Sequence, residues 1–336
     1  MRSAPVCLIV LTWNGRGWLT DCLNAVRALD AQPAEVVVVD NASTDGTADF
    51  LRDAFPEVRV VQLERNVGFA AGNNAGARQA SAEYLVFLNN DTRVQPQWLS
   101  ALLAPVDADA TVGLVTSRVE YMDPAGHIDS AGDGYLRCGG AFKHAHGQPV
   151  SHAGPSREVF SACGAGFLIR RNLFEAIGGF DEDFFMVYED VDLSYRARLR
   201  GSRCVYASEA VVLHAGSASL GRVSAHSVFY GQRNLEWTWL KNSPRRLFWR
   251  SLLSHLAYDV AGAAGYAVRG QLLSWGRAKW AALRSLPAVL RKRRVIQGTT
   301  TVDPDALWAL MEADWIARKR REKHFDFGAF SRRGQR

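Results

Sequence analysis

Val6-Cys7-Leu8-Ile9-Val10-Leu11 is an unbroken apolar run near the start of the chain. Such a run is typical of a parallel strand that is covered on both faces, because neither face then needs polar residues. Three more strands are expected at residues 35–40, 58–63 and 84–88, with segments of helical spacing between them. This alternation predicts an α/β fold with a doubly wound, mostly parallel sheet flanked by helices, whose ligands bind beyond the carboxyl ends of the strands.

The first expected helices occupy residues 18–29 and 72–82, and another follows the second strand, where Ser43 or Thr44 is expected to cap it. Residues 116–160 break into short pieces rich in Gly, His and Asp, as binding loops often do. Regular secondary structure is expected again after this segment: a strand at 166–170, a helix at 187–200 and two edge strands at 204–206 and 211–214.

Two domains are expected. A catalytic domain would occupy residues 1–235, with a nucleotide-binding half at 1–115 and an acceptor and catalytic half at 116–235, and a helical, basic extension would follow at 236–336. Residues 241–336 carry 20 Lys and Arg against 7 Asp and Glu, whereas the rest of the chain is net acidic. A basic segment of this kind favours a polyanionic surface, either nucleic acid or an anionic membrane.

The extension contains an apolar segment, residues 252–268, that is interrupted by His255 and Asp259 and is short for a transmembrane helix. Three arrangements are open: helices that lie on an anionic membrane, a helical subdomain packed on the core with a solvated basic rim, and a membrane span. The first is suggested by aromatic and basic residues, namely Trp275, Arg277, Lys279, Trp280, Arg284 and Arg291-Lys292-Arg293-Arg294.

Cysteine usage and the N-terminal segment both indicate a cytoplasmic protein. The five cysteines are scattered, without a C-x-x-C pair or metal-ligand spacing. The apolar run at residues 6–11 is too short for the core of a signal peptide. Together with the basic extension, these features lead us to expect a peripheral location on the inner face of the membrane.

Polar residues follow the expected strands, where they would meet at one edge of the sheet. Asp40 ends the second strand, and a carboxylate there can accept hydrogen bonds from a ribose or a base edge, although residues 41–47 also fit a simple helix cap. Gly68, Gly72 and Gly76 allow a helix to approach a ligand closely and its N-terminal amides to receive phosphate; tight helix–sheet packing is the alternative.

The chain also contains candidate ligands for a cation and candidate residues for a catalytic base. Asp91 follows the fourth strand and suits a hard divalent cation that bridges diphosphate oxygens, or it is a solvated strand end. Glu189 and Asp190 head a helix among bulky apolar residues, so burial is expected to raise a carboxyl pKa and make it a better base. His214 ends an apolar strand, where it either supplies a nitrogen ligand or simply packs.

Five motifs in this order resemble the family 2 glycosyltransferases of GT-A fold, and their bacterial rhamnosyltransferase-like members in particular. The likeness covers residues 4–235. The motifs are Leu11-Thr12-Trp13-Asn14, Val39-Asp40-Asn41-Ala42-Ser43-Thr44-Asp45-Gly46, Asn66-Val67-Gly68-Phe69, Leu88-Asn89-Asn90-Asp91-Thr92 and Tyr188-Glu189-Asp190-Val191-Asp192.

The resemblance implies an inverting, metal-dependent transfer of a sugar from a nucleoside-diphosphate sugar to a cell-surface glycan or glycolipid acceptor. It implies that Asp190 is the catalytic base, supported by Glu189, and that Asp91 and His214 hold Mg²⁺ or Mn²⁺. Asn89 stands where the family's metal motif has its first acid, so weaker metal affinity is expected. The nucleotide sugar would be bound by Thr12, Asn14, Asp40, Asn41, Ser43, Asn66, Gly68, Asn73, Asn89, Asn90 and Gly164.

The expected partners are a deoxythymidine- or uridine-diphosphate sugar, with L-rhamnose as the first expectation, a glycan or lipid-linked acceptor, and an anionic membrane surface, but no nucleic acid. A nicotinamide oxidoreductase is one alternative, although Thr20 replaces the third glycine of the dinucleotide fingerprint that Gly15 and Gly17 begin. A nucleic-acid binder would use the basic extension, which lacks a recognised motif. An inactive scaffold is the third alternative, and the candidate metal and base residues argue against it.

Overall fold

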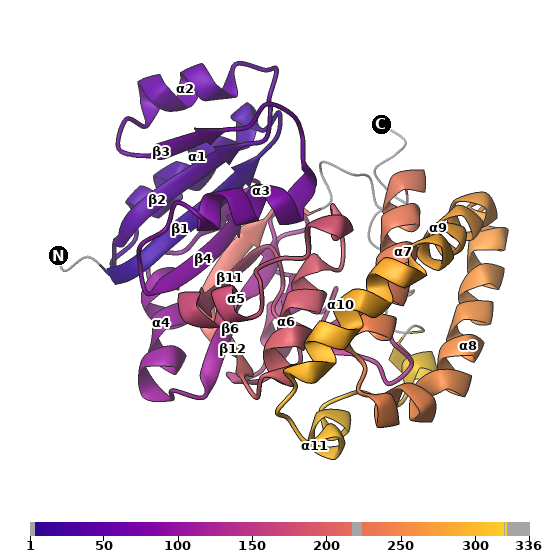
Figure 1. Cartoon of the computed structure of the whole chain (residues 1–336). Coiled ribbons are helices and arrows are strands. Elements are labelled where there is room, and N and C mark those ends of the chain that lie inside the picture. The colour runs from indigo at the N-terminus through magenta and orange to yellow at the C-terminus, as the bar shows by residue number, and fades with distance from the viewer. Residues whose placement is uncertain (1–3, 217–223, 319, 321–336) are drawn as a thin grey trace.

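A mixed sheet of ten strands is the centre of the computed structural model, which describes residues 4–216, 224–318 and 320 (Figure 1). The strands are β1 (Ala4–Thr12), β2 (Pro33–Asp40), β3 (Arg59–Gln62), β4 (Tyr84–Asn89), β5 (Thr92–Val94), β6 (Val112–Tyr121), β7 (Ile128–Ala131), β10 (Arg157–Glu158), β11 (Gly166–Arg170) and β12 (Arg203–His214). Their order is β10-β12-β6-β11-β4-β1-β2-β3, with β5 paired to β12 and β7 to β6. The strands β4, β1, β2 and β3 are parallel neighbours, and β11 runs antiparallel between β4 and β6.

Helices cover both faces of the sheet, because alternate residues of its central strands point to opposite sides. In β1, Val6, Leu8 and Val10 belong to one apolar core, whereas Cys7 and Ile9 belong to the other. The first core is closed by α1 (Arg16–Arg27), α2 (Thr47–Ala54) and α4 (Trp98–Ala108). The second is closed by α3 (Gly68–Ala77), α5 (Arg171–Ala176) and α6 (Glu189–Leu199). The predicted α/β sheet flanked by helices is thus confirmed.

Beyond the sheet, the chain forms a layer of helices. Its members are α7 (Ala225–Asn242), α8 (Arg245–Val268), α9 (Leu272–Arg284), α10 (Leu286–Gly298) and the short α11 (Pro304–Ala309). The helix α7 packs on α6, α9 and α10, and α8 lies at the far side of the molecule from the sheet (Figure 1). Among the described helices, none combines the length and apolar character needed to cross a membrane.

The predicted domain boundary at residue 235 falls inside α7, which is continuous across it. The division into a domain at 1–235 and an extension at 236–336 stays a prediction, and residues 319 and 321–336 of that extension lie outside the described residues.

Three local expectations need correction. The N-cap of α2 is Gly46, in a left-handed conformation, rather than Ser43 or Thr44, because both of those residues bond to Asn14 in the neighbouring loop. The two expected edge strands form one strand, β12, which lies between β10 and β6; a register shift between Ala207 and Val211 accounts for the apparent break. The irregular segment at 116–160 contains the end of β6, β7, a hairpin of β8 (Asp133–Tyr135) and β9 (Ala141–Lys143), a short 3₁₀ turn (Val150–His152) and β10.

Candidate active site

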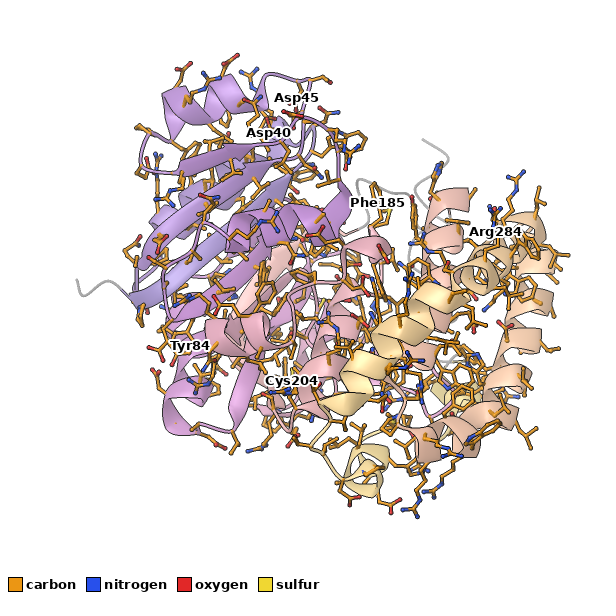
Figure 2. All side chains as sticks on the ribbon, in the orientation of Figure 1. Asp40, Asp45, Tyr84, Phe185, Cys204 and Arg284 are labelled. Atoms are coloured by element: carbon orange, nitrogen blue, oxygen red, sulfur yellow. The ribbon has the colours of Figure 1, made fainter. Side chains whose placement is uncertain are left out.

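The candidate site lies at the carboxyl ends of β1, β2 and β4. Thr12 is paired with Asp40 at the ends of β1 and β2, and the neighbouring Leu11 is paired with Asn89 at the end of β4. Figure 2 shows Asp40 at this edge of the molecule, and Tyr84, at the start of β4, at the opposite edge. Parallel pairing in register therefore brings together three residues that are far apart in the sequence.

The loops after β1 and β2 are joined by hydrogen bonds. The backbone N–H of Asn14 donates to Ser43 Oγ (2.9 Å), and that of Thr44 donates to Asn14 Oδ1 (2.7 Å). Next to them the N–H of Arg16 donates to Asp45 Oδ2 (3.1 Å). Asn14 and Ser43, two of the predicted nucleotide-binding residues, thus fix the shape of one continuous loop surface.

One carboxylate oxygen of Asp40 has no hydrogen-bond partner in the part of the chain that the structure describes. Its side chain is fully buried, and Oδ1 accepts a hydrogen bond from the N–H of Ser43 (2.9 Å). No hydrogen-bond donor among the described residues reaches Oδ2. A buried carboxylate oxygen without a donor is costly, and an N–H or O–H of a bound nucleoside is the kind of group that would satisfy it.

Asn41, Asn66 and Gly68 shape the turn before α3. The amide of Asn41 donates to Asn66 Oδ1 (3.0 Å), which also accepts from the N–H of Gly68 (2.9 Å). Gly68 has a left-handed backbone, with φ +83°, and a Cβ there would lie 2.5 Å from the carbonyl oxygen of Phe185. Asn41 and Asn66 therefore position backbone, whereas Asn73 donates within its own helix to the carbonyl of Phe69 (3.1 Å).

The two predicted metal ligands lie side by side. His214 Nε2 is 3.4 Å from Asp91 Oδ1, and both side chains are largely buried. Among the described residues, no cluster of three or more His, Cys, Asp or Glu side chains could hold a metal ion. Mg²⁺ and Mn²⁺ commonly use one or two protein ligands and complete their shell with water and phosphate oxygens, so this oxygen and nitrogen pair fits such a cation.

Residues behind His214 hold its ring in place. Asp129 Oδ2 is 2.9 Å from His214 Nδ1, and its other oxygen accepts from Lys143 Nζ (2.6 Å). Although burial alone would lower it, the hydrogen bonds with Asp129 and Asp91 raise the pKa of His214 to about 9, so a cation would have to displace the proton between Nε2 and Asp91. A carboxylate on the far nitrogen is the usual way to orient a metal-binding imidazole, so Asp129 would fix Nε2 toward Asp91.

The hydrogen bonds of Asn89 and Asn90, at the end of β4, go to residues other than Asp91 and His214. The N–H of Asn89 donates to the carbonyl of Ala165 (3.0 Å), and Asn90 Nδ2 donates to Thr12 Oγ1 (3.0 Å). A Cβ at Gly15 would lie 1.9 Å from Asn90 Nδ2, so a side chain there would displace this amide.

Asp190 stands at the start of α6 and is held by two backbone amides. Gly164 N–H donates to its Oδ2 (2.8 Å) and Val191 N–H to its Oδ1 (2.7 Å). Burial raises the pKa of Asp190, and these two donors offset part of the effect. Burial and the adjacent Asp190 also raise the pKa of Glu189 well above its usual value. Gly164 donates to Asp190, and the next residue, Ala165, accepts from Asn89, so Asp190 and the end of β4 contact one short segment.

The loop before α6 is strained and is clamped from two sides. Phe185, Val187 and Tyr188 all have positive φ, which costs energy for residues other than glycine. Asn234 of α7 is buried, and its Nδ2 lies 2.7–3.0 Å from the carbonyl oxygens of this loop, those of Phe184, Met186 and Val187. On the other side, the carbonyl of Phe185 accepts from the N–H of Phe69. Figure 2 labels Phe185, which lies between the sheet and the helical layer.

Sequence reasoning missed four residues of this region: Asp129, Asp133, Lys143 and Asn234. Asp133 is a buried carboxyl that accepts from Ser130 Oγ (2.5 Å). Its pKa is raised to about 8: burial raises it, Lys143 lowers it and the nearby Asp190 raises it again. The Ile128-Asp129-Ser130-Ala131-Gly132-Asp133 segment, with two acids in an apolar context, was the available signal.

Comparisons with known proteins agree on one family. The sequence model described as "Glycosyl transferase family 2" matches residues 7–178, about half of the chain. The O-antigen biosynthesis protein RfbC of Myxococcus xanthus is 34% identical over 233 residues, which are 65% of this chain and 18% of that protein. The chain thus spans about a fifth of the length of this relative.

Two further comparisons cover most of the other protein. The N-acetylglucosaminyl-diphospho-decaprenol L-rhamnosyltransferase of Mycobacterium tuberculosis is 27% identical over 263 residues, 68% of this chain and 85% of that enzyme. The solved structure of the mannosyltransferase PcManGT from Pyrobaculum calidifontis, in complex with GDP-Man and Mn²⁺, has a TM-score of 0.54 at 21% identity. It covers 92% of this chain and 86% of that chain, and at this identity the likeness shows a shared fold.

Proposed function

The chain belongs to glycosyl transferase family 2 and is a glycosyltransferase of GT-A fold, and we propose that it transfers a sugar, with inversion, from a nucleoside-diphosphate sugar to a hydroxyl of a cell-surface glycan or glycolipid. One observation carries the proposal. Asp190, a half-buried carboxyl with a raised pKa, is linked to the Asp91–His214 pair through two charged residues: His214 bonds to Asp129, Asp129 accepts from Lys143, and the charge of Lys143 acts on Asp190.

In this proposal Asp190 acts as the general base. Its carboxylate takes the proton from the acceptor hydroxyl while that oxygen attacks the anomeric carbon of the donor. The bond from that carbon to the diphosphate oxygen breaks, and its electron pair leaves with the nucleoside diphosphate. Attack from the face opposite the leaving group inverts the anomeric centre, so no carboxylate nucleophile is needed. The amides of Gly164 and Val191 fix the carboxylate for this role.

We further propose that Asp91 and His214 hold Mg²⁺ or Mn²⁺, as the donor set allows. When bound, the cation would supply positive charge beside the departing diphosphate. Asp129 orients His214, and the single carboxylate among the two ligands supports a site of modest affinity that the diphosphate of the donor completes. The Mn²⁺ present with the similar mannosyltransferase supports this assignment.

The nucleoside is proposed to lie over Asp40 and the loop that Asn14 and Ser43 form. The unpartnered Oδ2 of Asp40 would accept a hydrogen bond from it. L-Rhamnose from a deoxythymidine-diphosphate donor is the first candidate, because the mycobacterial relative is named an L-rhamnosyltransferase. Uridine-diphosphate sugars are the second candidate. A screen of nucleotide sugars by thermal shift, with and without Mn²⁺, decides between them, since a ligand that binds the native state raises Tm.

The acceptor is proposed to be lipid-linked or part of the cell envelope, with the enzyme peripheral on the inner face of the membrane. The names of two relatives, an O-antigen biosynthesis protein and an enzyme acting on a diphospho-decaprenol, support this class.

Replacement of Asp190 by Asn tests the base directly. Asp190→Asn should lower kcat by about 10²- to 10⁴-fold, the usual contribution of a general base, while donor binding stays within about threefold of wild type. Asp109→Asn, an exposed carboxyl paired with Arg203, is the control and should retain full activity. Turnover of Asp190→Asn at the wild-type rate would refute the assignment.

A further inference from the structure

The outer, exposed face of α8 is apolar, whereas the exposed face of an ordinary surface helix is polar. Between residues 251 and 268, every exposed residue is apolar, and the side chains of Leu253 and Val268 are 81% and 90% exposed. A helix at a water-facing surface normally turns its polar side outward. The apolar stripe is made by Leu253, Leu256, Ala257, Val260, Ala261, Ala264, Ala267 and Val268.

This stripe is continuous in the sequence with the turn into α9. Leu272 and Leu273, just after the turn, are also exposed, as are Trp280 and Leu283 further along α9. The positions in α8 recur every three or four residues, so they form one row about 23 Å long at 1.5 Å per residue. A contiguous apolar surface of this kind marks a contact with another molecule or with lipid.

The charges around the stripe indicate which contact it makes. Residues 245–284 contain seven basic residues and a single acid, Asp259, whose carboxylate is bonded to Lys279 Nζ (2.5 Å). Arg245 lies at the start of α8, Arg269 lies at its end, and Arg277 and Arg284 are exposed on α9; Figure 2 labels Arg284 at the periphery of the helical layer. Exposed apolar residues flanked by Arg suit a surface of anionic lipid headgroups.

The basic run at residues 291–294, singled out in the sequence, is partly used inside the protein. Lys292 is paired with Asp181 and Asp183, and Arg293 donates to the carbonyl of Leu240. Lys279, from the same group of basic residues, bridges Glu236 and Asp259. These residues hold the helical layer together, so the surface available for lipid is α8 and the turn into α9.

We propose that the α8–α9 hairpin lies in the headgroup boundary of an anionic membrane, with the apolar stripe inserted and the arginines at its edges. The biological sense of this contact rests on the proposed function, a lipid-linked or envelope acceptor, but the contact itself does not depend on catalysis. A second copy of the chain is a poorer occupant. A two-fold contact through this face would bring the exposed arginines of two copies together, and the nearby acids Asp259 and Asp305 are already paired within each copy.

Vesicle flotation tests the proposal with the full chain. Vesicles of phosphatidylcholine with 30% phosphatidylglycerol should carry the wild-type protein upward in a density gradient, and pure phosphatidylcholine vesicles should carry much less. The double variant Leu253→Ser, Val268→Ser keeps the net charge and changes two highly exposed side chains. It should reduce partition into the anionic vesicles at least tenfold, with an unchanged melting temperature.

Val295→Ser is the matched control, because Val295 is 70% exposed on α10, away from the stripe. It should float as wild type does. Donor binding by calorimetry, measured in the same proteins, should be equal in all three, so a failure of the proposed function would not be mistaken for a failure of docking.

Four outcomes would overturn the proposal. The wild type does not float on anionic vesicles; the double variant floats as well as wild type; or Val295→Ser loses as much binding as the double variant. The fourth is a wild-type dimer that the double variant dissociates, which would assign the stripe to a second copy.

Discussion

At the scale of single residues, the aspartates of this chain differ in role because their surroundings differ. Asp192 is fully buried but bonded to Arg196, Lys241 and Asn242, which makes it structural. Among the described residues, the hydrogen-bond donors to Asp190, two residues earlier, are backbone amides, so its carboxylate keeps lone pairs for a proton. The same residue type two positions apart thus supports packing in one case and, in the proposed mechanism, chemistry in the other.

Asp91→Asn tests the proposed cation site. The substitution keeps an oxygen near His214 but removes the negative charge, so Mn²⁺ affinity measured in the presence of nucleoside diphosphate should fall by about tenfold or more, about 1.4 kcal/mol. Isothermal titration of wild type, Asp91→Asn and the exposed Asp109→Asn gives the comparison. Equal Mn²⁺ affinity in all three proteins would remove Asp91 from the ligand set.

Asp133 provides a test in the pH dependence of stability. Its folded pKa of about 8 lies above the value of 3.8 for an ordinary Asp, so between these values the native state binds a proton that the unfolded state has lost. Its contribution to stability is therefore complete at low pH and is lost as pH rises toward 8, by at most about 1.4 kcal/mol per pH unit.

Asp133→Asn removes this titration while keeping the shape of the protonated acid. Urea unfolding between pH 5 and pH 9 should show wild type losing stability relative to the variant as pH rises. A difference in unfolding free energy that stays constant over this range would mean that Asp133 does not hold its proton.

At the scale of elements, the loop before α6 connects the start of α3 to the proposed base, Asp190. The N–H of Phe69, next to Gly68 at the start of α3, donates to the carbonyl of Phe185, and Asn234 of α7 donates to the next carbonyls, so the two helices jointly fix the start of α6. The strain of three positive φ values persists only because both contacts are made.

Gly68→Ala should break this contact. The new methyl group would lie 2.5 Å from the Phe185 oxygen and on a left-handed backbone, so we expect a loss of about 2–4 kcal/mol in unfolding free energy. Gly178→Ala is the control, because Gly178 is also left-handed but has no atom within 4 Å of its Cβ position, and it should cost about 1–2 kcal/mol. Equal losses in the two variants would show that the contact with Phe185 contributes nothing.

The strands, the helices between them and the polar residues at strand ends could be predicted because each depends on local sequence. An apolar run defines a strand, and whatever follows it lies at the edge of the sheet, as with Asp40 and Asp91. Asp129, Lys143 and Asn234 could not be placed this way. They reach the site from the β7–β9 segment and from α7, whose positions are set by tertiary packing rather than by a local pattern.

At the scale of the whole molecule, α6 joins the sheet to the helical layer. Leu193 and Ala197 belong to the core under the sheet, whereas Tyr195 and Leu199 belong to a second cluster that contains Leu307 of α11. Because the helix that begins with the proposed base is packed on both sides, its position depends on the integrity of both layers. The two layers should therefore unfold together rather than as separate domains.

Leu307→Ala tests this cooperativity from a position remote in the sequence from the proposed catalytic residues. Leu307 is fully buried, so truncation should cost about 2–5 kcal/mol, whereas Leu310→Ala, at a half-exposed position in the next turn, should cost about 0.5 kcal/mol or less. If the layers are coupled, hydrogen exchange in Leu307→Ala should accelerate at the amides of β1 and β4 as much as at those of α7. Acceleration confined to the helical layer would instead divide the chain into two independently folding units, as the sequence boundary at residue 235 suggests, and α6 would then be fixed by the sheet alone.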